Sequence, residues 1–266
     1  MPSPDPGAPD LGSEPLPTSR GRELRWSWLG RRPYGATWRL QEEIRRLLQA
    51  GKGPERLLLL EHDPVFTLGR NASEDDVLAD RGWLESRGVE VHESNRGGQV
   101  TYHGPGQLVG YPIVDLRPDR RDVGRYVRDL QEALIRTLGE IGIEARRKDG
   151  KDFIGVWVGD AKIASIGVHL ARWVAIHGFA LNVRTELAHF GGIVACGLDD
   201  VAMTSVEAVA GGAPSPADLA PLLSRHLSEI LERRLTLETR LDEAEIAAEA
   251  AKIPVKKPRR APRVGR

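Results

Sequence analysis

Residues 96–111 carry the densest concentration of chemically distinctive side chains in the sequence. They read RGGQVTYHGPGQLVGY, with five glycines, an arginine at the start and a histidine in the middle. Glycine lets a backbone approach a ligand closely and exposes N–H groups as donors, so we expect Gly97 and Gly98 to line a pocket for a carbonyl or anionic group. The segment lacks the lysine of a P-loop and the spacing of a dinucleotide-binding loop. A glycine-rich hairpin is the alternative interpretation.

The single cysteine of the chain, Cys196, lies in a second glycine-rich run, HFGGIVACGLDD. A lone cysteine is most often a small buried hydrophobe. In a glycine-rich loop, however, a thiol is accessible, and backbone N–H groups there can stabilise a thiolate and an oxyanion. A nucleophilic cysteine also needs a nearby cation or base. The sequence offers four candidates for that partner and does not decide among them: Lys162, His103, His177 and His189.

Lys162 stands out because its neighbours in DAKIASIGV are small or apolar. The alternation of a strand can point such a lysine into a site, where it acts as a base or as an electrostatic partner. The alternative is a lysine after a turn that points to water. No pair of histidines has the spacing of a zinc site, and one cysteine cannot form a cysteine cluster, so we expect no metal.

Hydrophobic periodicity predicts the elements that must position these segments. We expect helices over 34–50 and 123–141, and a third that begins at Ser215 with Pro216 at its first position and Asp218 closing a capping box. The predicted strands cover residues 56–61, 65–68, 153–158, 161–170 and 173–183. Because strands and helices do not alternate regularly, the expected fold class is α/β (α+β), with a mixed sheet flanked by helices.

The two ends of the chain differ from its body. Residues 1–20 are rich in proline, serine and glycine, without the apolar run of a signal peptide, and predict a disordered leader. We expect one folded domain over 21–235. The extension over 236–266 is expected to be helical first and then to form a disordered basic tail.

The formal net charge of zero is the sum of a basic tail and an acidic body. Residues 252–266 hold seven of the 38 basic residues and no acidic one, which leaves 31 basic against 38 acidic residues, a net of about −7. This balance gives no reason to expect nucleic acid as a partner. No apolar run approaches the roughly 20 residues of a membrane span. One cysteine and no possible intramolecular disulfide favour a reducing, cytoplasmic location.

Five segments together resemble one family. In their order along the chain, they are similar to the lipoyl(octanoyl) transferases, the octanoyl-[acyl-carrier-protein]:protein N-octanoyltransferases. The resemblance spans about residues 25 to 210, and both ends of the chain lie outside it. The segments are HDPVFTLGR (62–70), RGGQVTYHGPGQLVGYPIVDL (96–116), KIASIGV (162–168), HGFALNV (177–183) and ACG (195–197).

The resemblance implies a fold, an activity and partners. The fold is that of the biotin and lipoate protein ligases, with residues 21–235 as the catalytic domain. The activity is transfer of an octanoyl group from octanoyl-acyl carrier protein to a lysine of a lipoyl domain, either in the E2 subunit of a 2-oxoacid dehydrogenase or in the glycine cleavage H protein. It implies no cofactor, and a monomer is our default expectation.

The resemblance also assigns roles to residues. Cys196 would carry the acyl group, and Lys162 would favour its thiolate as an ammonium or take its proton as an amine. N–H groups near Gly97, Gly98 and Gly167 would hold the carbonyl oxygen, and the apolar Val100, Ile166 and Phe179 suit an eight-carbon chain. The implied substrate site comprises Arg96, Gly97, Gly98, Gln99, Val100, Thr101, Tyr102, His103, Ser165, Ile166, Gly167, Gly178, Phe179 and Ala180.

Two other functions fit the same sequence less well. An ATP-dependent lipoate or biotin ligase would not need the cysteine, and the biotin-type GRGR block is missing. A non-catalytic protein that only binds acylated carriers or lipoyl domains would have no use for a complete catalytic set. Acidic partners would dock on local basic residues, for which the candidates are Arg70, Arg96, Arg146, Arg147 and Lys148.

Overall fold

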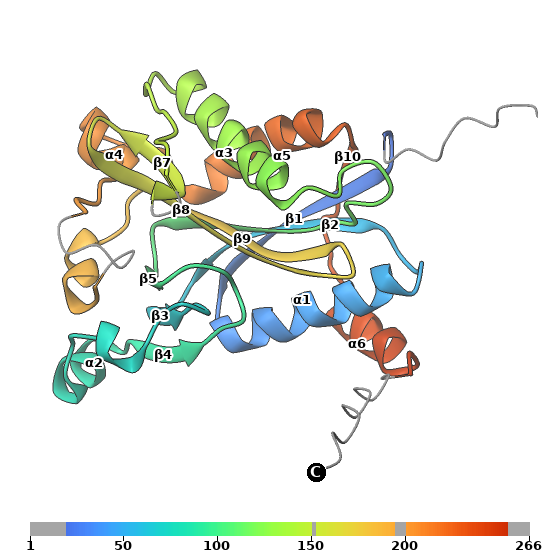
Figure 1. Ribbon diagram of the computed structural model, residues 1–266, viewed down its shortest axis with the longest axis horizontal. Helices are drawn as coiled ribbons and strands as arrows, with labels where there is room; N and C mark the ends of the chain where they lie inside the picture. Colours follow the sequence, from blue (N-terminus) through green and yellow to red (C-terminus); the bar gives the residue numbers. More distant parts are fainter. Residues whose placement is uncertain (1–19, 151–152, 195–200, 255–266) are drawn as a thin grey trace, which may run out of the picture.

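The computed structural model describes residues 20–150, 153–194 and 201–254. In this part of the chain, a seven-stranded mixed sheet forms the centre of the fold (Figure 1). β10, β1 and β2 run parallel to one another, and the successive pairs from β2 through β6, β9 and β8 to β7 are antiparallel. In spatial order the strands are β10 (Arg234–Leu237), β1 (Glu23–Arg32), β2 (Glu55–His62), β6 (Gln107–Ile113), β9 (Val174–Asn182), β8 (Ala161–Ala171) and β7 (Gly155–Val158).

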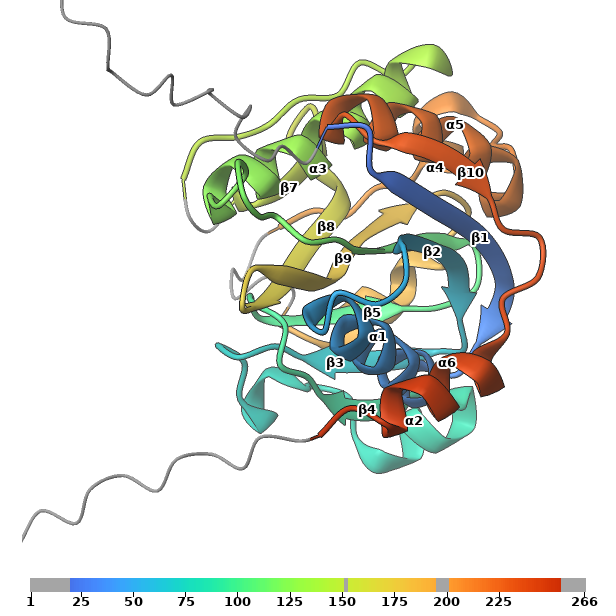
Figure 2. The same cartoon turned by 90° about the vertical axis from the view of Figure 1, so that its right-hand side faces the viewer.

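Helices cover both faces of this sheet. Figures 1 and 2 show α3 and α5 on one face and α1 and α6 on the other. The two remaining α-helices are short and lie at the periphery. The bounds are α1 (Tyr34–Gln49), α2 (Arg81–Arg87), α3 (Val123–Glu140), α4 (Val206–Ala210), α5 (Pro216–Leu231) and α6 (Glu243–Ala251), with 3₁₀ turns at Glu74–Asp76 and Leu187–Gly192.

The four leucines of β2 show why this strand is central. Leu57 and Leu59 pack into the core beneath α3 and α5, whereas Leu58 and Leu60 pack into the core beneath α1 and α6. All four are fully buried. Side chains alternate along a strand, so a continuous apolar run requires a cover on both faces. The prediction of a buried strand at this position is therefore confirmed, as is the predicted mixed-sheet fold class.

The predicted helices begin and end where the sequence signals place them. α1 buries Leu40, Ile44, Leu47 and Leu48 on one face, and α3 begins after Asp122, whose side chain accepts from the Arg125 backbone N–H. At the start of α5, Ser215 and Asp218 form the predicted capping box. Each cap satisfies backbone N–H groups that the helix itself leaves unpaired.

A smaller sheet beside the main one holds the start of the glycine-rich segment. Its strands are, in order, β4 (Glu90–Glu93), β3 (Val65–Leu68) and β5 (Val100–His103). Since β5 belongs to this sheet and β6 to the main sheet, the hairpin interpretation of residues 96–111 is wrong. The crossing between sheets uses Gly106, where φ is +79° and an added Cβ would lie 2.4 Å from the carbonyl oxygen of Arg184. Only glycine fits this turn.

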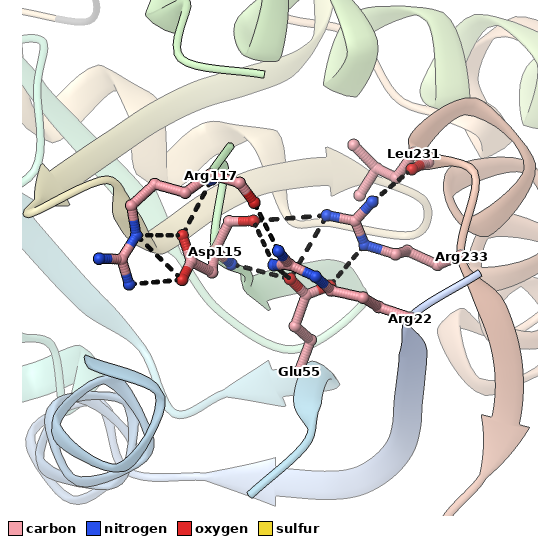
Figure 3. A network of polar contacts seen from close by, with 6 residues as sticks. All are labelled: Arg22, Glu55, Asp115, Arg117, Leu231 and Arg233. Atoms are coloured by element: carbon pink, nitrogen blue, oxygen red, sulfur yellow. Dashed lines mark hydrogen bonds and ion pairs between the residues drawn. The ribbon is translucent and has the colours of Figure 1, made fainter. Parts of the chain in front are cut away.

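The residues after α5 pack against the main fold. β10 extends the sheet by pairing with β1, and α6 buries Ile246 and Ala250 in the core beneath α1. A buried ion pair joins the residue just before β10 to the first residue of β2 (Figure 3). Arg233 Nε lies 2.6 Å from Glu55 Oε2, and both side chains are almost fully excluded from solvent. Glu55 also accepts from the Asp115 backbone N–H at 3.0 Å.

Replacing Arg233 with methionine is expected to destabilise the fold by about 3 to 5 kcal/mol, because Glu55 would keep a buried charge without its main partner. Urea unfolding measures this change in the free energy of unfolding. The matched control is Arg234→Met, which removes an exposed arginine at the next position. The double variant Arg233→Met/Glu55→Met is expected to recover most of the loss, since an apolar pair can replace a buried ion pair. Equal free energies of unfolding for Arg233→Met and Arg234→Met would contradict this account.

Candidate active site

A cavity of about 320 Å³ lies between the two sheets. The glycine-rich loop and β5 form one side, β8 and β9 form another, and the first turns of α3 close a third. Its volume lies within the usual range for ligand pockets. The residues that line it are Tyr34, Asn71, Arg96, Gly97, Gly98, Gln99, Val100, Thr101, His103, Tyr111, Val123, Val127, Ile154, Lys162, Ser165, Ile166, Gly167, Val168, His177, Gly178, Phe179 and Ala180.

The structure brings nearly all of the sequence-predicted site residues to this cavity. Two differ. Cys196 lies outside the described residues. Tyr102 points into the core of the smaller sheet, where its ring stacks on His189 at 4.8 Å and meets Phe66 edge-on. Neighbouring residues of a strand face opposite sides, so Tyr102 turns away from the side that Thr101 and His103 share. We leave Tyr102 out of the proposed site.

Arg96 holds the glycine-rich loop in place. Its guanidinium donates to Thr67 Oγ1 at 2.9 and 3.2 Å and to the Gly97 carbonyl oxygen at 3.2 Å. Only 7% of the residue is exposed, so Arg96 is not available to dock a partner on the surface. An arginine presents several donors in a fixed geometry, which suits it to fixing the shape of a loop.

The loop is also clamped from both sides by close backbone contacts. An added Cβ at Gly69 would lie 2.3 Å from the Gly98 carbonyl oxygen, and one at Gly167 would lie 2.8 Å from the Gly97 carbonyl oxygen. The Gly97 N–H donates to the Val168 carbonyl oxygen at 3.0 Å. That N–H is therefore already used, and the expectation that it holds the substrate oxygen is wrong.

The apolar part of the wall also depends on a glycine. Phe179 and Val100 are buried at the cavity. The ring of Phe179 lies over Gly110 of the neighbouring strand, where an added Cβ would lie 2.0 Å from the ring. Gly110 thus makes room for the ring, and the ring with Val100 and Ile166 gives the cavity a surface that suits an alkyl chain.

Lys162 is buried on the cavity wall, with 3% of its surface exposed. The interpretation of a lysine that points to water is therefore wrong. Its backbone pairs with residues 202–204: the Lys162 N–H donates to the Ala202 carbonyl oxygen at 2.8 Å, and the Thr204 N–H donates to the Lys162 carbonyl oxygen at 2.9 Å. Lysine is rarely buried to this extent, so its position on a cavity wall makes Lys162 a candidate for chemistry.

The described residues on both sides of the Cys196 segment have backbone partners. Before it, the Val194 N–H donates to the Asp76 carbonyl oxygen at 2.8 Å. After it, residues 202–204 pair with Lys162, as described above. Cys196 is six residues before Ala202 in the sequence. The backbone of Lys162 therefore pairs with residues that come six to eight positions after Cys196.

The histidine candidates differ in position and in charge. His103 and His177 line the cavity, whereas His189 stacks on Tyr102 outside it. Burial lowers the pKa of His103 well below its usual value and lowers the pKa of His177 to about 3. Both rings are therefore neutral at physiological pH. Neither supplies a cation for a thiolate, and so low a pKa also makes each ring a weak base. Lys162 is therefore the favoured candidate.

Two tyrosines that line the cavity were not predicted from the sequence. The Tyr34 hydroxyl donates to Ser94 Oγ at 2.9 Å, and the Tyr111 hydroxyl lies 2.7 Å from His62 Nε2. Burial raises the pKa of both phenols, so both keep their protons. Tyr34 looked like the first residue of a helix and Tyr111 like the end of the glycine-rich run. Their meeting at one cavity depends on packing that no local pattern encodes.

Acidification is expected to destabilise the fold through the buried histidines. Burial lowers the pKa of His62 to about 4 and that of His177 to about 3, both below the ordinary value of 6.5. Between about pH 6.5 and pH 4 the unfolded chain binds protons that the folded chain does not, so the free energy of unfolding falls as the pH falls. Each histidine contributes a slope of about 1.4 kcal/mol per pH unit, measurable by urea unfolding across that range.

The variant His62→Gln tests this assignment. Glutamine can keep polar contacts with the Arg32 carbonyl oxygen and the Tyr111 hydroxyl, which bind the two ring nitrogens of His62, but it does not titrate. The dependence of stability on pH is expected to become shallower. If the free energy of unfolding of His62→Gln changes with pH as steeply as that of the unsubstituted protein, the assignment to His62 is contradicted.

Comparison with known proteins decides the family. Residues 33–228 match the family described as the lipoyl protein ligase A/B catalytic domain. An octanoyltransferase from Solibacter usitatus is 50% identical to the chain over 204 residues, which cover 77% of this chain and 91% of that protein. The chain belongs to the octanoyltransferase family. An octanoyltransferase from Geobacter metallireducens is 44% identical over 212 residues, covering 79% of this chain and 95% of that protein.

The resemblance inferred from the sequence motifs is thereby confirmed. The reaction of this octanoyltransferase is an acyl transfer that belongs to lipoate biosynthesis. In the part of the chain that the structure describes, no helix is long and apolar enough to cross a membrane. Across residues 20–150, 153–194 and 201–254, no group of three or more histidines and carboxylates is arranged to hold a metal ion.

Solved structures confirm the expected fold of the octanoyltransferase. A putative lipoate protein ligase from T. acidophilum with bound lipoic acid superposes with a TM-score of 0.67 at 21% identity, covering 86% of this chain and 94% of that one. Lipoate-protein ligase A bound with ATP gives a TM-score of 0.67 at 20% identity, covering 88% and 95%. At this level of identity the likeness establishes a shared fold and nothing about the reaction.

Proposed function

We propose that the chain transfers an octanoyl group from octanoyl-acyl carrier protein to a lysine of a lipoyl domain through a thioester on Cys196. The acceptors are E2 subunits of 2-oxoacid dehydrogenases and the glycine cleavage H protein. The observation that carries this proposal is the burial of Lys162 on the cavity wall, with its backbone paired to the segment that follows Cys196. The protein would act as a cytoplasmic monomer, without a cofactor or nucleic acid.

The first half-reaction moves the acyl group onto the enzyme. The Cys196 thiolate attacks the carbonyl carbon of the carrier thioester, a new C–S bond forms, and the carrier thiolate leaves and takes up a proton. Lys162 can assist in two ways. As an ammonium it stabilises the attacking thiolate, and as an amine it takes the proton of the thiol. Both forms use the same residue and differ in where the proton lies.

The second half-reaction delivers the acyl group to the acceptor. The amine of the acceptor lysine attacks the Cys196 thioester, an amide forms, the Cys196 thiolate leaves and the nitrogen loses a proton. Passing through a thioester divides one transfer into two easier steps. The octanoyl chain would lie along the apolar wall made by Val100, Ile166 and Phe179, where each buried methylene contributes about 0.8 kcal/mol.

The rival function is that of an ATP-dependent ligase, because solved ligases share the fold. The two differ in the activated form of the acyl group. With octanoyl-carrier as donor and no ATP, we expect a lipoyl-domain acceptor to gain one octanoyl group in its intact mass. With free octanoate and ATP, we expect no gain. The reverse pattern would establish the ligase. No transfer under either condition would support a protein that only binds these partners.

A further inference from the structure

The indole ring of Trp157 lies beside the side-chain nitrogens of two lysines. Lys162 Nζ lies 5.7 Å from the ring centroid, and Lys148 Nζ lies 4.4 Å from it. Trp157 is on β7 and is 2% exposed. Tryptophan binds cations through the negative face of its ring within about 6 Å, and more strongly where water is excluded. No sequence motif pointed to a role for this residue.

The ring is fixed from several directions. Its Nε1–H donates to the Phe153 carbonyl oxygen at 3.0 Å, and the Phe153 ring meets it edge-on at 5.9 Å between centroids. The backbone of Trp157 exchanges two hydrogen bonds with Arg146, at 2.8 and 2.9 Å. Ring and backbone are therefore both anchored, and the ring can act as a rigid surface for the lysine head group.

Gly155 lies against the same end of the Lys162 side chain. A Cβ added at Gly155 would lie 2.4 Å from Lys162 Cε and 3.3 Å from its Nζ. Gly155 has φ +151°, and its carbonyl oxygen accepts from Gln131 Nε2 of α3 at 2.9 Å. The flexible four-carbon stem thus runs along a backbone that lacks a side chain, and its ammonium end reaches the indole ring.

We propose that Trp157 is a positioning residue whose ring holds the Lys162 ammonium at the cavity wall. The inference rests on the proposed function, in which Lys162 acts on the Cys196 thiol. A lysine side chain loses considerable rotamer freedom when it is held in one geometry. Small errors in the placement of a catalytic group are costly in rate. A fixed aromatic face next to a side-chain-free backbone reduces the number of positions that Nζ can occupy.

The test uses the full chain with three substitutions. Trp157→Leu removes the ring, Trp157→Phe keeps a weaker ring, and Trp83→Leu is the matched control. Trp83 also carries a cation, with Arg87 Cζ 4.5 Å from its ring centroid, but it lies on α2 and does not line the cavity. Acylation of the enzyme by octanoyl-carrier is followed in a single turnover. The pH dependence of thiol alkylation by iodoacetamide is measured in parallel.

Trp157→Leu is expected to slow acylation about 10-fold, the effect of a desolvated cation–π contact on a rate. Its apparent Kd for the carrier is expected to change less than about twofold, because the ring acts on Lys162 and not on the carrier. The alkylation profile is expected to move to higher pH. In Trp157→Phe the rate of acylation is expected to fall about threefold, with a smaller shift of the alkylation profile. Trp83→Leu should match the unsubstituted protein in both measurements.

An alkylation profile that does not move in either Trp157 variant would overturn the inference, since a merely structural role changes stability without changing the titration of the thiol. If Trp157→Leu does not fold, Trp157→Phe alone decides by the same criterion. Failure of the proposed function is distinguishable. In that case the unsubstituted enzyme forms no octanoyl adduct, whereas failure of the inference alone leaves the adduct and its rate unchanged in the Trp157 variants.

Discussion

Replacing Cys196 with alanine is expected to abolish octanoyl transfer to a lipoyl domain, with a loss of more than about 1,000-fold in rate. The physical reason is that alanine cannot form the thioester, so the acceptor amine would have to attack the carrier thioester directly. The measurement is the rate of octanoylation of the acceptor with octanoyl-carrier as donor.

The conservative variant Cys196→Ser refines this test. A serine hydroxyl is a much weaker nucleophile than a thiolate at neutral pH. It would form an ester, from which the serine oxygen leaves poorly when the acceptor amine attacks. We expect Cys196→Ser to accumulate little acyl-enzyme and to transfer almost nothing. Full activity of Cys196→Ala would show that the acyl group passes directly between carrier and acceptor, and the proposed thioester would be discarded.

Replacing Lys162 with methionine is expected to have the second largest effect, a fall of about 100-fold in the rate of transfer, within the range that general acid–base catalysis contributes. Methionine fills similar space without a charge or a proton. Because Cys196 is the single cysteine of the chain, iodoacetamide reports on that thiol alone. Alkylation at neutral pH is expected to slow, and its pH profile to move upward. The matched control is Lys52→Met, which removes an exposed lysine.

Lys162→Arg separates the two ways in which Lys162 can act. Arginine keeps the positive charge but does not give up a proton near neutral pH. If the ammonium stabilises the thiolate, the alkylation profile of Lys162→Arg stays close to that of the unsubstituted protein. If the amine takes the proton, Lys162→Arg behaves like Lys162→Met. An unchanged alkylation profile in Lys162→Met would remove Lys162 from the proposed mechanism.

The main elements of the fold were predictable because their signals are local. The leucine stripe of α1, the capping box of α5 and the four leucines of β2 each depend on residues close in the sequence. The division of residues 96–111 between two sheets was not predictable in this way. Neither β5 nor β6 was predicted from the sequence, because five glycines obscure the strand pattern of this segment. The pairing of β5 with β3 and of β6 with β2 depends on residues far away in the sequence.

The site was predictable where sequence motifs mark it and hidden where packing creates it. Arg96 and Lys162 were identified from their surroundings in the sequence, and strand alternation could have excluded Tyr102. Trp157 gave no signal, because its relation to Lys162 arises only when β7 pairs with β8. The hydrogen bond of the Gly97 N–H was equally unpredictable, since its acceptor, the Val168 carbonyl oxygen, lies on a strand far away in the sequence.

The most direct test of the proposed mechanism is the intact mass of the enzyme after incubation with octanoyl-carrier, without ATP and without an acceptor. We predict that one octanoyl group is added, that a thiol such as dithiothreitol removes it, and that Cys196→Ala does not acquire it. Adding a lipoyl domain should return the enzyme to its original mass as the acceptor gains the group. An adduct that persists in Cys196→Ala, or an enzyme that octanoylates the acceptor without ever carrying the group itself, would contradict the proposal.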